Sequence, residues 1–308
     1  MKKIIYAIFT LFIVNITGCK DEYKESSFEK DIPIVRSNTI YFLGSSTIEY
    51  FTPSLKMWPE KYQLNTINLG KGGELIDTMC IRIGALPAHA TFSKNKIKIN
   101  EKNYFKADWG IDNSLKPFEA RIVDIDGIIG VDTEGYYFES QQEAYIDINQ
   151  AYPIKSLQKL IPDSIFILNL GKNNLLNLSH GQDSYNYVFD KTKQCAEWIN
   201  KNITSRTIVV GHFTAVNAND DLSSNIQALN KDLKLYYSSN FFDLNYLLSD
   251  RNIWQNLQIT PTTSDYEAQV KGDLAVSLSS DSIHLNNKTN QFITDQIYKT
   301  MIEKKWIN

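Results

Sequence analysis

Short apolar runs that end at a glycine recur along this 308-residue chain and constrain its fold more than any other feature. Runs of this length without alternation are typical of strands that are buried on both faces. The runs are Thr39–Leu43 before Gly44, Thr66–Leu69 before Gly70, Ser164–Leu170 before Gly171 and Thr207–Val210 before Gly211, with Asn240–Asp243 as a fifth candidate.

Helical patterns separate these runs. We expect helices over residues 74–83, 185–200 and 222–236. The C-terminal segment also places Ile293, Ile297, Met301 and Ile302 on one helical face. Strands that alternate with helices form βαβ units, so the pattern predicts a parallel sheet covered by helices.

Residues 89–149 interrupt this alternation, because no helical period is found there. Short strands are expected at 97–99, 121–123, 128–129 and 136–138, with turns at Asp126-Gly127 and Glu134-Gly135. The segment, which carries Trp109, is too long for an ordinary loop, and we interpret it as a β-rich insertion. Two roles remain open: a decorative lid, or a substrate-binding flap or carbohydrate-contacting module.

The N-terminus has the features of an export signal. Lys2 and Lys3 precede the apolar stretch 4–16, and the segment ends in Ile16-Thr17-Gly18-Cys19. This ending resembles the bacterial lipoprotein box, which implies a signal peptide over 1–18, a lipid on Cys19 and a tether over 19–38. We therefore expect a lipid-anchored protein of the bacterial cell envelope, in the outer membrane. Cys19-Lys20-Asp21-Glu22 resembles a surface-export signal, and an ordinary charged tether remains the alternative.

Charge and composition limit the other partners. The net charge of −3 gives no basic surface for nucleic acid. No spacing of ligand residues predicts a zinc or calcium site, and the glycines near residue 70 lack the pattern of a nucleotide loop. We thus expect no metal, no cofactor, and no membrane contact beyond the lipid anchor. Cys80 and Cys195 leave a disulfide and two buried thiols both open.

Four short polar motifs fall at the ends of predicted strands or before the last helix. In an open parallel sheet, active sites form beyond the carboxyl ends of the strands, so the first three motifs would converge. Asp281 and His284 are close enough in sequence for one helical turn or tight loop to bring them together. The motifs are Gly44-Ser45-Ser46-Thr47, Asn68–Glu74, Gly171-Lys172-Asn173-Asn174 and Asp281-Ser282-Ile283-His284.

These residue types suit nucleophilic catalysis. The hydroxyl of Ser46 needs a base, which His284 can supply, while Asp281 accepts the other imidazole N–H. The tetrahedral intermediate needs donors aimed at its oxyanion. The Asn173 amide and the backbone N–H groups of Gly73 and Ser46 are suitable.

In this order the four motifs resemble the conserved blocks of SGNH (GDSL-like) hydrolases. Ser46, Gly73 and Asn173 match the first three blocks, and Asp281 and His284 match the last. The resemblance implies a flavodoxin-like three-layer α/β/α sandwich, with the hydrolase domain over 39–88 and 150–308 and the β-rich insertion over 89–149.

Two positions depart from the family pattern. Gly-Asp-Ser reads Gly-Ser-Ser, so Ser45 stands where aspartate is usual and competes with Ser46 as nucleophile. Asn-Asp reads Asn173-Asn174, and we expect activity to survive this change because that aspartate is not catalytic. His212, which follows the fourth strand, is interpreted as a loop residue, with substrate contact as the alternative.

The resemblance implies ester hydrolysis through an acyl-serine intermediate. We expect a small-molecule or carbohydrate ester as substrate, with short acyl chains and with O-acetyl groups on carbohydrate as the first hypothesis. Two alternatives remain: a lipase or acyltransferase on the same triad, and an inactive surface lipoprotein that binds glycan.

Overall fold

The computed structural model describes residues 36–307. The expected signal peptide, Cys19 and most of the tether lie outside these residues, so their assignments stay predictions. Within the described part, no helix is long and apolar enough to cross a membrane.

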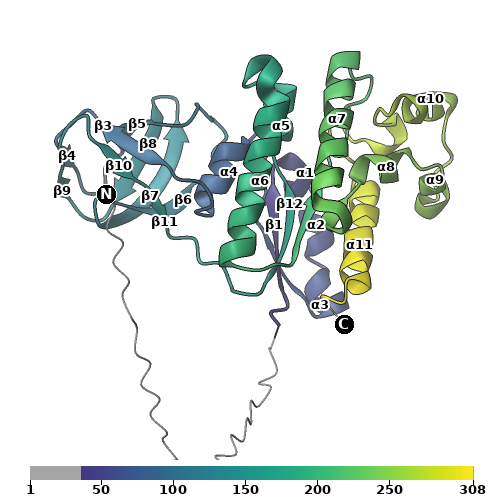
Figure 1. The fold of residues 1–308 in the computed structure, drawn as a ribbon, viewed down its shortest axis with the longest axis horizontal. Coiled ribbons are helices and arrows are strands. Elements are labelled where there is room, and N and C mark those ends of the chain that lie inside the picture. Colours follow the sequence, from purple (N-terminus) through teal and green to yellow (C-terminus); the bar gives the residue numbers. More distant parts are fainter. Residues whose placement is uncertain (1–35, 308) are drawn as a thin grey trace, which may run out of the picture. The chain divides into compact units, whose positions relative to one another are not determined.

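A five-stranded sheet forms the centre of the main layer structure (Figure 1). All of its neighbouring strands run parallel, in the order β14-β13-β12-β1-β2. This is the flavodoxin-like order, and the five predicted strands and the predicted fold class are confirmed. The strands are β1 (Thr39–Gly44), β2 (Asn65–Asn68), β12 (Ile165–Asn169), β13 (Thr207–Val210) and β14 (Phe241–Phe242).

Helices cover both faces of this sheet, which explains its uninterrupted apolar strands. Along β1, Ile40 and Phe42 belong to one buried cluster, whereas Tyr41 and Leu43 belong to the other. Successive side chains point to opposite faces, so each strand supplies both cores. The first core packs against α1 (Ser46–Glu49), α2 (Thr52–Leu55), α3 (Trp58–Tyr62), α8 (Leu244–Ser249), α9 (Asn252–Leu257) and α11 (Asn287–Glu303), and the second against α4 (Ile76–Arg82), α5 (Lys172–Leu176), α6 (Ser184–Asn202) and α7 (Asp220–Tyr237).

The four predicted helices are confirmed as α4, α6, α7 and α11. The shorter helices, together with α10 (Thr263–Lys271), were not predicted. Most have only one turn or slightly more, which is too short for an apolar period to be read from sequence.

The insertion forms a second, seven-stranded antiparallel sheet, in the order β10-β3-β5-β8-β7-β6-β11. Its last strands carry the sheet to Ser156, past the segment expected from the sequence. The strands are β3 (His89–Phe92), β5 (Asn103–Ala107), β6 (Phe118–Ile122), β7 (Ile125–Asp132), β8 (Gly135–Ser140), β10 (Ala151–Pro153) and β11 (Lys155–Ser156), beside a small sheet of β4 (Lys96–Ile97) and β9 (Ala144–Tyr145).

The prediction of a turn at Asp126-Gly127 is wrong, because both residues lie within β7. The chain instead turns at Val123 and Asp124, whose φ angles are +52° and +62°. Gly127 serves close packing, since a Cβ there would overlap the ring of Phe138. The predicted turn before Gly135 is confirmed.

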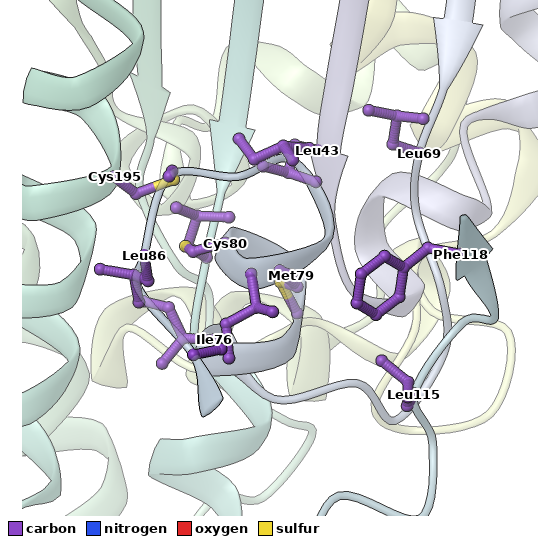
Figure 2. Packing of buried hydrophobic residues seen from close by; sticks show 14 of the residues in the cluster. Leu43, Leu69, Ile76, Met79, Cys80, Leu86, Leu115, Phe118 and Cys195 are labelled. Carbon is purple, nitrogen blue, oxygen red and sulfur yellow. The ribbon is translucent and has the colours of Figure 1, made fainter. Parts of the chain in front are cut away.

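The core of the insertion is continuous with the core of the sandwich. Leu115 and Phe118 of the insertion belong to the same buried cluster as Leu69 and Met79 (Figure 2). The two sheets therefore share apolar packing. Cys80 and Cys195 lie in this cluster as buried free thiols.

Candidate active site

The first motif places two serines directly after β1, in different environments. Ser45 is fully buried, and its hydroxyl has no hydrogen-bond partner in the structure. Ser46 is partly exposed and begins helix α1. As the first helical residue, Ser46 has a backbone N–H without an intrahelical acceptor. Of the two serines, only Ser46 offers its side chain at the surface.

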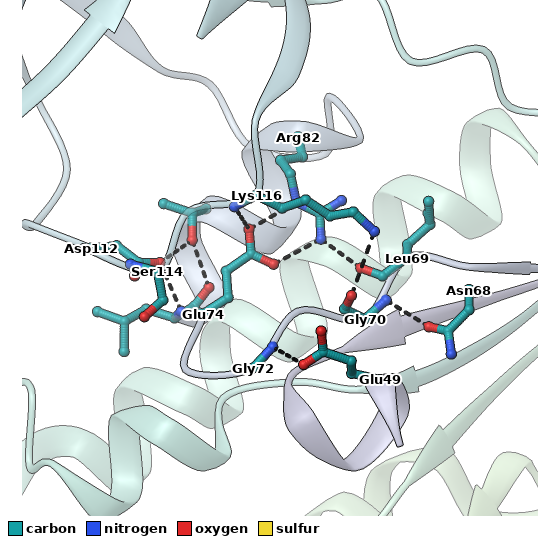
Figure 3. Close-up of polar contacts among 12 residues, drawn as sticks. Glu49, Asn68, Leu69, Gly70, Gly72, Glu74, Arg82, Asp112, Ser114 and Lys116 are labelled. Atoms are coloured by element: carbon teal, nitrogen blue, oxygen red, sulfur yellow. Dashed lines mark hydrogen bonds and ion pairs between the residues drawn. The ribbon is translucent and has the colours of Figure 1, made fainter. Parts of the chain in front are cut away.

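The glycine-rich turn after β2 packs against this serine. The backbone N–H of Lys71 donates to the carbonyl of Gly44. The backbone N–H of Gly72 donates to Oε2 of Glu49 at 2.7 Å (Figure 3). A Cβ on Gly72 would lie 3.8 Å from the Cβ of Ser46. Gly73 follows with φ of +79°, a left-handed conformation that suits glycine. The turn thus reaches Ser46 by its backbone.

The third motif lies against the same turn. The side-chain amide of Asn173 donates to the carbonyl of Glu74 at 2.9 Å, which leaves its second hydrogen for another acceptor. Buried Asn174 accepts from the backbone N–H of Ile76 at 3.0 Å, where helix α4 begins. Asn174 therefore joins the third motif to the second through an oxygen that aspartate would also provide.

Asp281 and His284 meet in a tight loop rather than on a helix. Nδ1 of His284 is 2.7 Å from Oδ2 of Asp281, whose Oδ1 accepts the backbone N–H of His284 at 2.8 Å. Ser282 between them has φ of +77°. The bond to His284, with the backbone bonds, holds the pKa of Asp281 below its usual range, so this carboxylate stays ionised near neutral pH.

Two successive carbonyls anchor this loop to the rest of the fold, and a third closes the loop on itself. The carbonyl of Ser282 accepts the N–H of Val216 at 2.8 Å, and the carbonyl of Ile283 faces Nζ of Lys172 at 3.4 Å. Within the loop, the carbonyl of His284 accepts the N–H of Ser280 at 2.9 Å. The loop is therefore held both by its own backbone and by two distant segments.

His284 stands beside helix α1. Its ring meets the ring of Tyr50 edge-on, with 4.6 Å between centroids, and the N–H of Tyr50 donates to the carbonyl of Ser46. The described contacts include no hydrogen bond between Ser46 and His284. Such bonds are often long in unliganded enzymes and shorten when substrate binds. The structure thus brings the histidine to the helix that Ser46 begins.

Two buried bases lie behind this loop. Lys172 is only 4% exposed, and its Nζ lies 3.2 Å from the ring centroid of Phe213. Burial lowers the pKa of Lys172 to about 7, although the negative charge of Asp281 acts to raise this pKa. His212 is 1% exposed, which removes it from substrate contact, and burial together with Lys172 lowers its pKa to about 3. Sequence reasoning missed Lys172; the only signal was a lysine between the glycine and asparagine of the third motif.

Comparisons with known proteins were made by sequence and by structure. No family model matches the chain, and no curated protein sequence matches it. Among solved structures, the chain is similar to the psychrotrophic esterase EstA from Pseudoalteromonas sp., at 13% identity and a TM-score of 0.44, over 88% of this chain and 98% of that one. It is also similar to a gut microbial diltiazem-metabolizing enzyme, at 12% identity and a TM-score of 0.43, over 87% of this chain and 47% of that one. This chain therefore spans about half of the second enzyme.

Taken together, the four motifs place a partly exposed serine hydroxyl, an imidazole with its carboxylate partner, and hydrogen-bond donors at one edge of the sheet. Within residues 36–307, no group of three or more histidine, cysteine or acidic side chains is arranged to hold a metal ion. The chemistry that these side chains can perform themselves is nucleophilic acyl transfer.

Proposed function

We propose that this protein is an SGNH-type serine ester hydrolase in which Ser46 is the nucleophile. The observation that carries the proposal is the Asp281–His284 pair, which is held in a fixed loop beside the helix that Ser46 begins. The glycine-rich turn at Gly73 and the amide of Asn173 lie on the same edge of the sheet.

The proposed reaction has two halves. Oγ of Ser46 attacks the ester carbonyl carbon while Nε2 of His284 takes its proton, and the carbonyl oxygen becomes an oxyanion. The oxyanion accepts hydrogen bonds from the N–H groups of Ser46 and Gly73 and from the Asn173 amide. Collapse breaks the ester bond, and the alcohol leaves with the proton from His284. Water then repeats the sequence on the acyl-serine, which releases the acid.

Asp281 supports His284 in both halves of the proposed reaction, the formation and the hydrolysis of the acyl-serine. Because it accepts the Nδ1 hydrogen, it fixes the tautomer in which Nε2 is free to take the serine proton. Its lowered pKa keeps a negative charge beside the imidazolium that forms.

For the substrate, we propose short-chain acyl esters, with O-acetyl groups on carbohydrate as the first class to test. This choice is supported by the lipoprotein box at Cys19, which would place the enzyme at the bacterial envelope, where acetylated glycans occur. The β-rich insertion, whose Ser114 lies against Gly73, would add surface for such a substrate.

The test compares hydrolysis of p-nitrophenyl acetate and a long-chain p-nitrophenyl ester by the purified protein and two serine variants. Ser46→Ala should abolish turnover, because the proposed acyl-enzyme forms on the Ser46 hydroxyl. Ser45→Ala is the matched control, and it should retain turnover because the Ser45 hydroxyl is buried without a partner.

The outcomes separate the hypotheses. Turnover of the acetate ester that is lost only in Ser46→Ala, with little turnover of the long-chain ester, supports a short-acyl esterase. Loss of turnover only in Ser45→Ala would show that Ser45, and not Ser46, is the nucleophile. Equal turnover in all three proteins would overturn the mechanism.

A further inference from the structure

One segment of the insertion reaches the glycine-rich turn and contacts it through buried polar groups. Asp112 lies between β5 and β6 and is 3% exposed. Its Oδ2 accepts the backbone N–H of Leu75 at 2.8 Å and the hydroxyl of Thr78, while Oδ1 accepts the N–H of Ser114 at 2.9 Å (Figure 3). Leu75 and Thr78 lie at the start of α4, so the carboxylate is placed where a helix favours negative charge.

The insertion itself holds Asp112 in place. The backbone N–H of Asp112 donates to the hydroxyl of Tyr136 at 2.6 Å, and that hydroxyl donates to the carbonyl of Gly110 at 2.9 Å. Tyr136 is 5% exposed and belongs to strand β8. The carboxylate is thus mounted on the second sheet, not on a free loop.

A second contact joins the insertion to Glu74. The Glu74 side chain is fully buried and binds Arg82 through both carboxylate oxygens, at 2.8 and 2.7 Å. The same carboxylate accepts the backbone N–H of Lys116 at 3.2 Å. The main-chain carbonyl of Glu74 accepts the Asn173 amide. One residue therefore connects the insertion to a proposed oxyanion donor.

Gly73 lies between these two contacts. A Cβ on Gly73 would overlap the Ser114 hydroxyl, so the Ser114 side chain covers the α-carbon of this glycine. The insertion thereby restricts the movement of the glycine-rich turn at three successive residues: at the α-carbon of Gly73, at the Glu74 side chain and at the Leu75 N–H.

We propose that residues 112–116 of the insertion form a positioning segment for the oxyanion hole, which fixes the directions of the Gly73 N–H and the Asn173 amide. This inference rests on the proposed esterase function. It assigns the insertion a part in catalysis, because donors must be aimed at the developing oxyanion before the reaction begins. Residues 112–116 contact the turn rather than the reacting atoms, so their role is positioning.

The first test is Asp112→Asn, with Asp126→Asn as the matched control. Asp112 accepts hydrogen bonds at both oxygens, whereas an asparagine amide accepts at one, so one N–H donor would face an NH₂ group. Asp126 lies in the same insertion and pairs with Arg121 on the exposed surface. We expect kcat to fall by about 10- to 100-fold in Asp112→Asn, with KM changed by less than about threefold, because a mispositioned donor weakens the transition state more than the ground state.

Two further readouts distinguish positioning from general loss of stability. A trifluoromethyl ketone forms a tetrahedral oxyanion on Ser46, so its inhibition constant should rise by the same factor as kcat/KM falls. Amide hydrogen exchange over residues 70–76 should accelerate in Asp112→Asn and not in Asp126→Asn. Should Asp112→Asn fail to fold, Thr78→Val removes one donor to the same carboxylate and should shift all three readouts in the same direction by less.

Three results would overturn the proposal. Unchanged exchange over 70–76 would show that Asp112 does not hold the turn. Faster exchange with an unchanged kcat would show that holding the turn has no catalytic effect. If Ser46→Ala hydrolyses esters as fast as the unaltered protein, the proposed function itself fails and the catalytic role of the segment fails with it, whereas exchange still reports whether the segment holds the turn.

Discussion

Replacing buried Lys172 by methionine should remove a large pH dependence of stability. In the folded chain the pKa of Lys172 is lowered from 10.5 to about 7 by burial. Between these two values the unfolded chain binds more protons at this site than the folded chain does. The free energy of unfolding therefore rises with pH in this window, and below about pH 7 the fold carries the full cost of a buried ammonium.

The size of the effect follows from the two pKa values. One pKa unit is worth about 1.4 kcal/mol, so titration of this site alone should raise the free energy of unfolding by about 3 kcal/mol between pH 6.5 and 9.5. Methionine has a similar length without a charge, so Lys172→Met should lack this rise. Relative to the unaltered protein, the free energy of unfolding of the variant should be highest at the acid end of the range. The variant loses the contact with the Ile283 carbonyl at every pH.

The assay is urea unfolding followed by tryptophan fluorescence at several pH values, for the unaltered protein and the variant. Other groups titrate in this range in both proteins, so the difference between the two isolates Lys172. Lys231→Met, at an exposed position of α7, is the matched control and should follow the unaltered protein. The decisive quantity is the difference in free energy of unfolding between Lys172→Met and the unaltered protein. If this difference changes by less than about 0.5 kcal/mol between pH 6.5 and 9.5, Lys172 is not a buried lysine that titrates in this range.

Four further predictions concern the site and the cysteines. Asn173→Ala should lower kcat by about a hundredfold or more in ester hydrolysis, and an unaffected rate would remove this amide from the oxyanion hole. Asp281→Asn should lower kcat by about 10⁴-fold, because the amide no longer fixes the histidine tautomer; steady-state kinetics beside a thermal melt will show whether folding survives. Cys80 and Cys195 should resist maleimide in the folded protein and both react in denaturant without reductant, whereas a mass lower by two hydrogens and no labelling would reveal a disulfide. Cys19→Ser should move the protein from the membrane fraction to the soluble fraction on cell fractionation, and continued membrane retention would contradict the lipid anchor.

The buried pair of Glu74 and Arg82 contributes both to stability and to the geometry near the glycine-rich turn. Burial raises the pKa of Glu74, and the bonds from Arg82 oppose the shift. Removing one partner of such a pair leaves an uncompensated buried charge, which is strongly destabilising. Because Arg82 also donates to the carbonyl of Leu69, the pair ties α4 to the end of β2. This tie holds the strand end from which the glycine turn begins.

The sequence by itself determined the parallel sheet, its long helices and the order of the four motifs. Apolar runs, helical periods and closing glycines are local signals, because they reflect the burial and backbone conformation of a few neighbouring residues. The position of the motifs at strand ends followed from the same signals, since parallel strands present their carboxyl ends at one edge.

Only the tertiary structure decided which groups within these motifs are buried, paired or exposed. Ser45 and Ser46 are adjacent and chemically identical, yet only the fold buries one of them. The contact of Asp112 with Leu75 joins residues 37 positions apart, and that of Lys172 with Ile283 joins residues 111 positions apart. Desolvation and hydrogen bonding depend on what distant segments bring to a site, and this is why the aim of the donors and the shifted pKa values had no local signal.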